Sequence, residues 1–301
     1  MNLGIALGGG GAKGFAHIGV LDVLEKEKIK VKFVAGNSIG AVIGALYCLF
    51  GSIEKLHSLS RSFIESEEFK TLGLDKFYTE DSNILRRFKK KVFEKYYFGA
   101  LLFKKSHSQI DATRQLFYNL FSNYTFDDLK IPFVCSALDI NSGEEVVFKK
   151  GLLAEAIWAT CAIPGIFPPL IKEQRVLVDG GVINNIPVDL LKELGAKTVI
   201  AVYLGSLPRF DSKPDTGYRI TQRSLAFMKY HFDQHILSRA DLIINPDVEE
   251  FHWADFQAIE ELIKRGQETA KRNLRKIKSV CSFWYQLKRF RFQEFLTLQF
   301  L

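Results

Sequence analysis

The sequence lacks the cysteine spacing that zinc ribbons and disulfide frameworks require. It holds four cysteines in 301 residues, and none of them forms a Cys-x-x-Cys pair. This scattered usage argues against a metal ribbon and against a disulfide-stapled fold. We expect free thiols in a reducing compartment, at Cys48, Cys135, Cys161 and Cys281.

A secretory leader and a long apolar run are missing as well. The amino terminus shows no basic start followed by a long apolar core and a small-residue cleavage site, so no secretory signal is visible. The longest apolar run, residues 39–50, spans 12 residues, whereas a membrane-spanning helix needs about 20. We expect a cytoplasmic protein with a peripheral membrane contact, and residues 39–50 as a buried helix.

The composition that is present is that of an ordinary globular protein. Of the 301 residues, 47% are hydrophobic and 25% are charged, which is enough to bury a large core. Apolar strand patterns alternate with helical patterns, and this rhythm predicts an α/β fold with a mostly parallel sheet covered on both faces. We expect one main domain over residues 1–280 and an aromatic-basic tail over residues 281–301.

Positive charge is concentrated in short clusters. The formal net charge is +7, from 41 Lys and Arg against 34 Asp and Glu. Such clusters suit an anionic surface of lipid headgroups or nucleic acid, although a solvated helix face is the simpler explanation of any single cluster. No recognised nucleic-acid module surrounds them, so we expect no nucleic-acid partner. The clusters are residues 89–91, 104–105, 271–272, 275–278 and 288–289.

Two regions carry no catalytic motif. Residues 51–125 are rich in aromatics and lysine, with a helix expected over residues 111–121. Basic and aromatic residues interleave in this region, as over residues 88–105, so we expect residues 51–125 to form an amphipathic helical cap over a site for acyl chains or a helical insertion packed on the core. The tail over residues 281–301 either packs on the body, forms a dimer contact or lies in a membrane interface, and the sequence leaves these three open.

The stretch from Val31 to Leu46 predicts a nucleophile. A β-branched apolar run leads into Gly36-Asn37-Ser38-Ile39-Gly40, and an apolar segment with helical character follows. Such a turn strains the backbone of its apical serine and leaves no room for a bulky Cβ beside it, which explains Gly36 and Gly40. Ser38 would then lie before a helix amino terminus, whose dipole favours a developing negative charge.

A second glycine-rich turn follows the first expected strand, residues 3–8. It contains the G-x-G-x-x-G pattern of a dinucleotide-binding loop as Gly9, Gly11 and Gly14. The acidic residue expected at the end of the second strand is missing, because that strand ends in the serine turn. The alternative is an anion cradle, and two such turns on neighbouring parallel strands would bring Gly10, Gly11 and Ser38 to one sheet edge.

Ester hydrolysis through a serine also needs a base, and two arrangements are open. Asp179 ends an expected strand over residues 175–178 and precedes Gly180 and Gly181, so it either caps a turn or performs chemistry. A Ser-Asp-His triad would instead need a histidine late in the chain. The candidates, none of which stands in a glycine-marked loop after a strand, are His231, His235 and His252. For the earlier His17, on the helix after the glycine loop, we expect a structural role.

Four segments together resemble the motifs of the patatin-like phospholipases, of the bacterial type. They are Gly9 to Gly14, Gly36 to Gly40, the proline-rich segment Ala159 to Pro169, and Asp179-Gly180-Gly181 with Asn185-x-Pro187. The resemblance covers about residues 3–205, in order and at suitable spacing. It implies a three-layer α/β/α fold related to the α/β-hydrolases but without their histidine, and it implies no metal or cofactor.

Carried over residue by residue, the resemblance implies a catalytic dyad with Ser38 as nucleophile and Asp179 as base. It implies an oxyanion hole built from the glycine loop, at Gly9, Gly10 and Gly11. Lys13 stands where the family has a basic residue, which would hold the loop or meet a lipid phosphate. The remaining motif glycines are Gly14, Gly36, Gly40, Gly180 and Gly181.

The expected activity is hydrolysis of fatty-acyl esters in phospholipids or lysophospholipids at a membrane surface. Acyl transfer or thioester hydrolysis by the same serine is a second enzymatic interpretation. A non-catalytic regulator on this fold is a third, and the intact serine, aspartate and glycine loop argue against it. The sequence leaves open whether the protein forms a homo-oligomer.

Overall fold

The computed structural model describes residues 2–77, 106, 108–210, 213–282 and 285 of the chain. Residues 78–105 and 107 of the cap or insertion predicted over residues 51–125 lie outside the described residues. Residues 286–301, most of the predicted tail, lie outside them too. The fold and the site below are therefore built from the motif-bearing segments and the helices that surround them.

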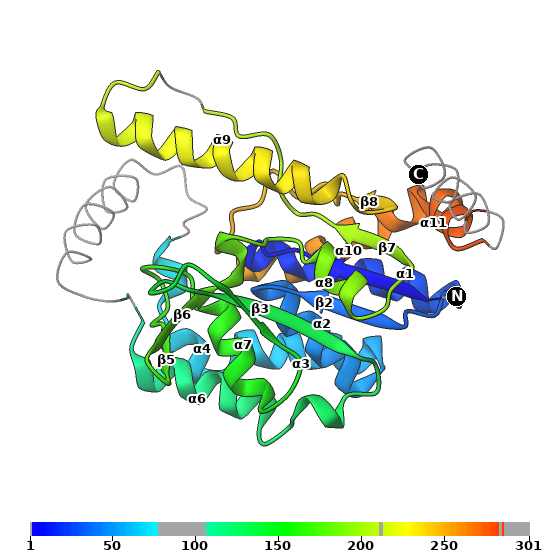
Figure 1. The fold of residues 1–301 in the computed structure, drawn as a ribbon, viewed down its shortest axis with the longest axis horizontal. Helices are drawn as coiled ribbons and strands as arrows, with labels where there is room; N and C mark the ends of the chain where they lie inside the picture. The colour runs from blue at the N-terminus through cyan, green and yellow to red at the C-terminus, as the bar shows by residue number, and fades with distance from the viewer. Residues whose placement is uncertain (1, 78–105, 107, 211–212, 283–284, 286–301) are drawn as a thin grey trace, which may run out of the picture.

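An eight-stranded mixed sheet organises the described part of the chain (Figure 1). Seven strands lie in the order β5-β6-β3-β2-β1-β7-β8, and β4 pairs with β3 beside this path. The strands are β1 (Leu3–Leu7), β2 (Phe33–Gly36), β3 (Phe133–Asp139), β4 (Glu145–Phe148), β5 (Leu170–Lys172), β6 (Arg175–Asp179), β7 (Thr198–Val202) and β8 (Leu242–Ile244).

The two ends of this sheet run differently. Strands β3, β2, β1, β7 and β8 are parallel neighbours, as the βα rhythm predicts. Strands β4, β5 and β6 are joined antiparallel at the other end, where β6 runs against β3. A turn at residues 141–143 joins β3 to β4, with Gly143 at φ 78°. The strand expected over residues 175–178 is present as β6. The three-residue strand β5 was not predicted from the sequence.

Helices follow most of the strands. They are α1 (Ala16–Lys26), α2 (Ile39–Phe50), α3 (Ile53–Glu65), α4 (Glu67–Thr71), α6 (Ile110–Phe121), α7 (Leu153–Cys161), α8 (Val188–Glu193), α9 (Gly217–Leu237), α10 (Ile259–Arg272) and α11 (Leu274–Val280). Asn273 separates α10 from α11, and its side chain donates to the Thr269 carbonyl oxygen at 2.9 Å. Within the described segments, no helix has both the length and the apolar character needed to cross a bilayer.

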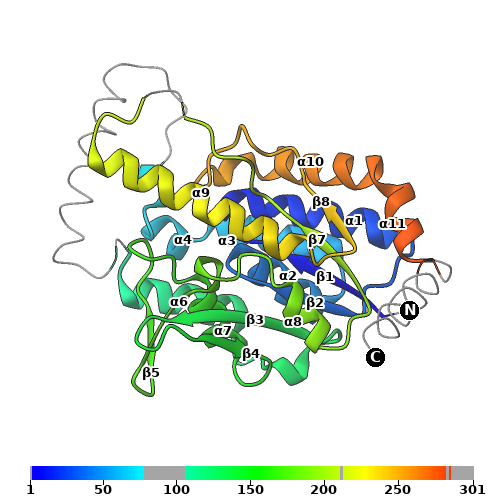
Figure 2. The same ribbon diagram turned by 45° about the horizontal axis from the view of Figure 1, so that its top comes forward.

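Alternate side chains of β1 show the layers. Leu3, Ile5 and Leu7 pack into the larger core with α1, α2, α7 and α10. Ala6 faces the opposite way, into a smaller core with α8 and the last turn of α9. Figure 2 shows α1 and α10 side by side against the sheet. Burial of β1 on both faces explains its continuous apolar sequence. The four cysteines are free thiols, as predicted.

Candidate active site

Ser38 lies at a sharp turn between β2 and α2. Its backbone has φ 54° and ψ −131°, a region that residues with a side chain rarely adopt. A Cβ on Gly36 would meet the backbone of Gly40, and a Cβ on Gly40 would meet the carbonyl oxygen of Leu7. The close approach of these backbones therefore requires both glycines and holds the serine in its strained conformation.

The buried side chain of Asn37 ties this turn to the sheet. Its Oδ1 accepts hydrogen bonds from Ser136 N at 2.8 Å and from Thr160 Oγ1 at 3.3 Å. Its Nδ2 donates to Ser136 Oγ at 2.9 Å and to the Asn184 carbonyl oxygen at 2.5 Å. Thr160 Oγ1 in turn accepts from the Ser38 amide at 3.2 Å. Sequence reasoning missed Asn37 and Thr160 as site residues, because their partners come from distant parts of the chain.

Asp179 reaches the same turn from the end of β6, where it lies opposite Ala137 of β3. Its buried carboxylate lines the same cleft as Ser38, and it accepts a hydrogen bond from the Gly181 amide at 2.6 Å. Burial raises the pKa of Asp179 to about 6, against the opposing effects of the Ser38 side chain, the Gly181 amide and the positive charge on Lys229. A raised pKa makes this carboxylate a stronger base than an ordinary aspartate at neutral pH.

The glycine loop lies beside Ser38, because β1 and β2 are parallel neighbours with Leu7 in register with Gly36. In the described part of the chain, no group accepts a hydrogen bond from the amides of Gly10 or Gly11. The Gly9 amide donates to the Asn185 carbonyl oxygen at 3.1 Å. The oxyanion hole at Gly9, Gly10 and Gly11 stays a prediction, and the amides of Gly10 and Gly11 are the two without an acceptor in the described segments.

Other motif residues hold the loop in place. His17 is fully buried and donates from Nε2 to the Gly8 carbonyl oxygen at 2.8 Å, while burial lowers its pKa to about 4. A Cβ on Gly14 would meet the Ile39 side chain, so this glycine lets the loop pack on α2. Lys13 lines the cleft next to the loop, and burial lowers its pKa.

The later histidines do not complete a triad with Ser38. His231 and His235 lie on α9 in exposed positions, and His235 Nε2 accepts from Arg239 at 2.7 Å. His252 Nδ1 accepts from the Ala254 amide at 3.2 Å. Among the residues that the structure places around Ser38 and Asp179 in the cleft, there is no histidine. Aspartate is thus the group that this geometry offers as base.

Two hollows meet at Ser38. An open cleft of about 720 Å³ is lined by the glycine loop, Ser38, Asp179 and residues of α9. A narrow apolar cavity of about 50 Å³ also reaches Ser38, and its walls come from α2, α3, α4, α6 and the segment before α10. Its apolar walls include the side chains of Phe63, Phe69, Leu116, Phe167 and Phe256. The serine thus stands between a wide cleft with charged and polar groups in its wall and a small apolar cavity.

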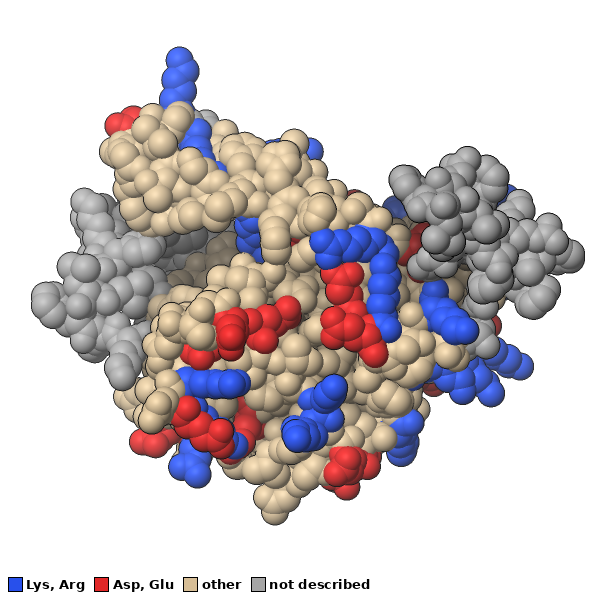
Figure 3. Space-filling view, in the orientation of Figure 1, with Lys and Arg blue, Asp and Glu red and all other residues tan. Residues whose placement is uncertain are grey.

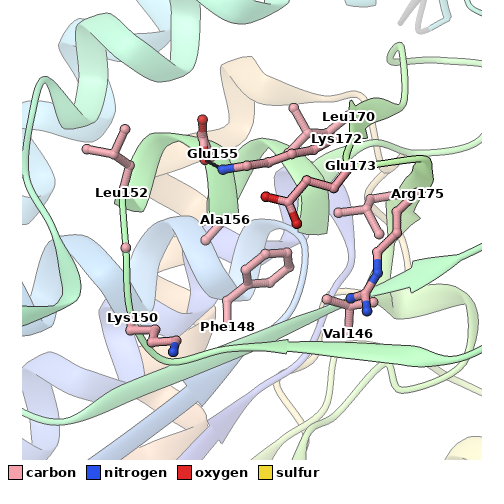
Figure 4. Close-up of a pocket in the computed structure, with 12 residues that line it drawn as sticks. Val146, Phe148, Lys150, Leu152, Glu155, Ala156, Leu170, Lys172, Glu173 and Arg175 are labelled. Atoms are coloured by element: carbon pink, nitrogen blue, oxygen red, sulfur yellow. Dashed lines mark hydrogen bonds and ion pairs between the residues drawn. The ribbon is translucent and has the colours of Figure 1, made fainter.

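A further hollow lies at the antiparallel end of the sheet and has no part in this site. It measures about 420 Å³ and is lined by residues of β4, β5, β6 and α7 (Figure 4). Lys172 forms an ion pair with Glu155 at 2.6 Å in its wall. The hollow includes neither Ser38 nor Asp179, and its lining holds no nucleophile.

Comparison with known proteins agrees with this geometry. The family described as "Patatin-like phospholipase" matches residues 5–192, which include the glycine loop, Ser38 and Asp179. The chain belongs to the patatin-like phospholipase family. Helices α9, α10 and α11 follow the matched residues in the chain and lie outside the family match.

Relatives in this family are far longer than the chain. It is 33% identical over 211 residues to patatin-like phospholipase domain-containing protein 6 of Homo sapiens, and 31% identical over 207 residues to lysophospholipase NTE1 of Mycosarcoma maydis. Each match covers 69% of this chain but only 14% and 10% of those proteins. The bacterial type inferred from the sequence stays a prediction.

A solved structure shows the same fold. The crystal structure of VipD from Legionella pneumophila aligns with a TM-score of 0.51 and 13% sequence identity. The alignment covers 91% of this chain and 66% of that one. The expected patatin-like α/β fold with a mostly parallel sheet is thus confirmed, and at this identity the likeness concerns the fold alone.

Proposed function

We propose that this protein hydrolyses fatty-acyl esters of phospholipids or lysophospholipids through a Ser38–Asp179 dyad. The observation that carries the proposal is the placement of the buried Asp179 carboxylate beside Ser38, in one cleft and at a strained strand-to-helix turn. Membership of the patatin-like family supports the reaction class. The names of the relatives, a lysophospholipase and a phospholipase-domain protein, support a lipid ester as substrate.

In the first half of the proposed reaction, Ser38 Oγ attacks the acyl carbonyl carbon while its proton passes to Asp179. The negative charge that develops on the carbonyl oxygen is stabilised by the amides of Gly10 and Gly11, which have no acceptor among the described residues. The ester C–O bond then breaks, and the leaving alcohol or lysolipid takes the proton from Asp179. Gly9 keeps the loop in place through its bond to Asn185.

The second half releases the fatty acid. Water attacks the acyl carbon, Asp179 accepts its proton, and the same two amides stabilise the second tetrahedral intermediate. The bond between Ser38 Oγ and the acyl carbon breaks, and the proton returns from Asp179 to the serine. Every proton transfer in this cycle uses one carboxylate, so the charge state of Asp179 sets the pH dependence.

The two hollows suggest how the ester lies. An acyl chain fits the chemistry of the apolar cavity, whose walls include Phe63, Phe69 and Leu116. The remainder of the lipid would occupy the cleft, where Lys13 and Lys229 supply positive charge for a phosphate. The cavity measures only about 50 Å³, so its side chains must shift to admit a chain. We expect single-chain lysophospholipids to react faster than two-chain phospholipids.

Labelling with a serine-directed phosphonate tests the nucleophile. Intact mass should show one label on the wild type and none on Ser38→Ala. Ser279→Ala, which changes an exposed serine of α11, is the matched control and should label like the wild type. An equally labelled Ser38→Ala variant would assign the nucleophile elsewhere.

Fatty-acid release from a phospholipid and a lysophospholipid tests the dyad. Ser38→Ala and Asp179→Asn should each lower kcat by at least about 10³-fold while circular dichroism shows a folded protein. Wild-type rates in either variant would contradict the dyad.

Acyl transfer is the second candidate, favoured by the size of the open cleft, which would admit an alcohol beside the acyl-enzyme. Adding glycerol to the release assay distinguishes the two reactions. An acylglycerol as the main product would replace hydrolysis by transfer, whereas free fatty acid as the main product would support hydrolysis. A folded wild-type protein that neither labels nor releases fatty acid would favour a non-catalytic binding role.

A further inference from the structure

Helix α9 extends beyond the body of the protein. In Figures 1 and 2 it runs out past the sheet as a single long helix. Buried side chains occur only near its carboxyl end, at Asp233, Ile236 and Leu237. A helix that packed along its whole length would bury an apolar stripe throughout. Most of α9 therefore contributes little to the core, and its apolar residues need another explanation.

The projecting part of α9 exposes a set of large apolar side chains, which we call the α9 apolar surface. At about 100° per residue, its five positions fall within one half of the helix circumference. The exposed fractions of these side chains lie between 47% and 64%. The members are Tyr218, Ile220, Leu225, Met228 and Phe232.

This surface is continuous with the catalytic cleft. Leu225 and Met228 line the cleft that holds Ser38 and Asp179. From the same stretch of helix, Lys229 donates to the Gly181 carbonyl oxygen at 3.1 Å. Figure 3 shows α9 as a largely uncharged ridge above a hollow in the body of the protein. A lipid that meets the α9 apolar surface therefore lies at the entrance of the cleft.

The net positive charge of the α9 region favours an anionic partner. Between residues 213 and 237 the chain has four Lys and Arg, namely Lys213, Arg219, Arg223 and Lys229. It has two carboxylates in the same stretch: Asp215 pairs with Arg219 at 2.8 Å, and the buried Asp233 pairs with Lys229 at 3.4 Å. The stretch therefore keeps a net charge of +2, from four cations and two carboxylates. Exposed apolar side chains flanked by cations are typical of helices that lie in the interface of an anionic membrane.

We propose that α9 docks the protein on an anionic lipid surface, with its apolar surface in the boundary between headgroups and acyl chains. The site lies outside the two stretches for which the sequence predicts membrane contact, residues 88–105 and 281–301. One part of this inference rests on the proposed lipid hydrolysis, namely that a lipid substrate passes from the bilayer along α9 into the cleft. Binding itself is separable from hydrolysis and can be measured alone.

The experiment compares two variants of the full chain. The test variant is Ile220→Glu with Phe232→Glu, two members of the α9 apolar surface that do not line the cleft. The control is Ile171→Glu on β5, since Ile171 and Ile220 have the same exposed fraction of 54%. Each protein is sedimented with vesicles of equimolar phosphatidylcholine and phosphatidylglycerol, and with phosphatidylcholine alone. Hydrolysis of a soluble short-chain p-nitrophenyl ester is measured in parallel.

Wild type and Ile171→Glu should bind the anionic vesicles, and the double variant should bind about tenfold more weakly. Binding to neutral vesicles should be weaker for all three proteins. Soluble ester hydrolysis should agree within about twofold among them, because Ile220 and Phe232 do not line the cleft. These results together would support docking through α9.

Two results would overturn the proposal. One is a double variant that sediments with anionic vesicles as the wild type does. The other is a wild type that is dimeric without lipid while the double variant is monomeric, since a second copy would then cover the α9 apolar surface. If no protein hydrolyses any ester but the double variant alone loses vesicle binding, the proposed function fails and docking through α9 stands.

Discussion

The turn at Ser38 and the helix α9 border one cleft, yet they are built in opposite ways. Around Ser38 the backbone segments touch, so that neither Gly36 nor Gly40 has room for a Cβ, and the neighbouring Asn37 is fully buried. Helix α9 packs only near its carboxyl end and leaves large apolar side chains in solvent. Close packing holds reacting atoms in place, whereas an exposed surface can meet a partner without disturbing the fold.

Adding one methyl group at the Ser38 turn and one at the start of α9 should give the largest difference in stability between the two regions. Gly40→Ala places a Cβ against the Leu7 carbonyl oxygen, so we expect it to lower the free energy of unfolding by about 4 kcal/mol or more. Gly217→Ala, at the start of α9, meets no atom within 4 Å and should be neutral or stabilising by less than about 1 kcal/mol. Urea unfolding measures both. Equal stability of the two variants would remove the contrast.

The charge of Asp179 should give the next largest effect. Its pKa is about 6 in the folded protein against 3.8 as the ordinary value, so the native state favours the protonated form. As pH rises through this range the unfolded chain loses its proton first, and the fold loses about 3 kcal/mol by pH 7. Asp179→Asn should therefore be the more stable protein at pH 7, with the difference fading below pH 4.

Unfolding of both proteins at pH 7 and at low pH measures this difference. An Asn exchange at the exposed Asp127 is the control and should show no comparable gain. A wild type more stable than Asp179→Asn at pH 7 would mean that contacts of the ionised carboxylate outweigh its burial.

Lys229 connects the two regions and should give a smaller effect. Its positive charge lowers the pKa of Asp179, so Lys229→Met should raise that pKa. Because the ionised carboxylate acts as base, kcat/KM should rise with pH around 6 in the wild type and at higher pH in the variant. The change in rate at pH 6 should stay below about tenfold. Lys229→Arg keeps the charge and should keep the midpoint, and a downward shift in Lys229→Met would contradict the assignment.

The smallest effect concerns the stability of the α9 variants. Ile220→Glu with Phe232→Glu should change the free energy of unfolding by no more than about 0.5 kcal/mol per residue, because both side chains are exposed. Thermal or urea unfolding without lipid gives the value. A decrease of several kcal/mol in the free energy of unfolding would show that the α9 apolar surface is packed in solution. In that case α9 would be closely packed, as the turn at Ser38 is.

Sequence alone determined the local parts of the site. A strand, a Gly-x-Ser-x-Gly turn and an apolar helix make Ser38 a predicted nucleophile because the steric demands of that turn act over a few residues. The glycine loop at Gly10 and Gly11 is equally a local feature of the sequence. The alternation of strand and helix patterns is local too, and it predicted the mostly parallel sheet. The family motifs, read in order, added Asp179.

Tertiary structure alone decided which groups meet and which stay exposed. Asn37 reaches Ser136, Thr160 and Asn184, and the Gly9 amide donates to the Asn185 carbonyl oxygen. The raised pKa of Asp179 likewise depends on burial by segments far apart in the chain. The exposure of α9 follows from its having few packing partners in the body. Steric rules of a turn act between neighbours in sequence, but burial and hydrogen-bond partners are set only when distant segments pack together.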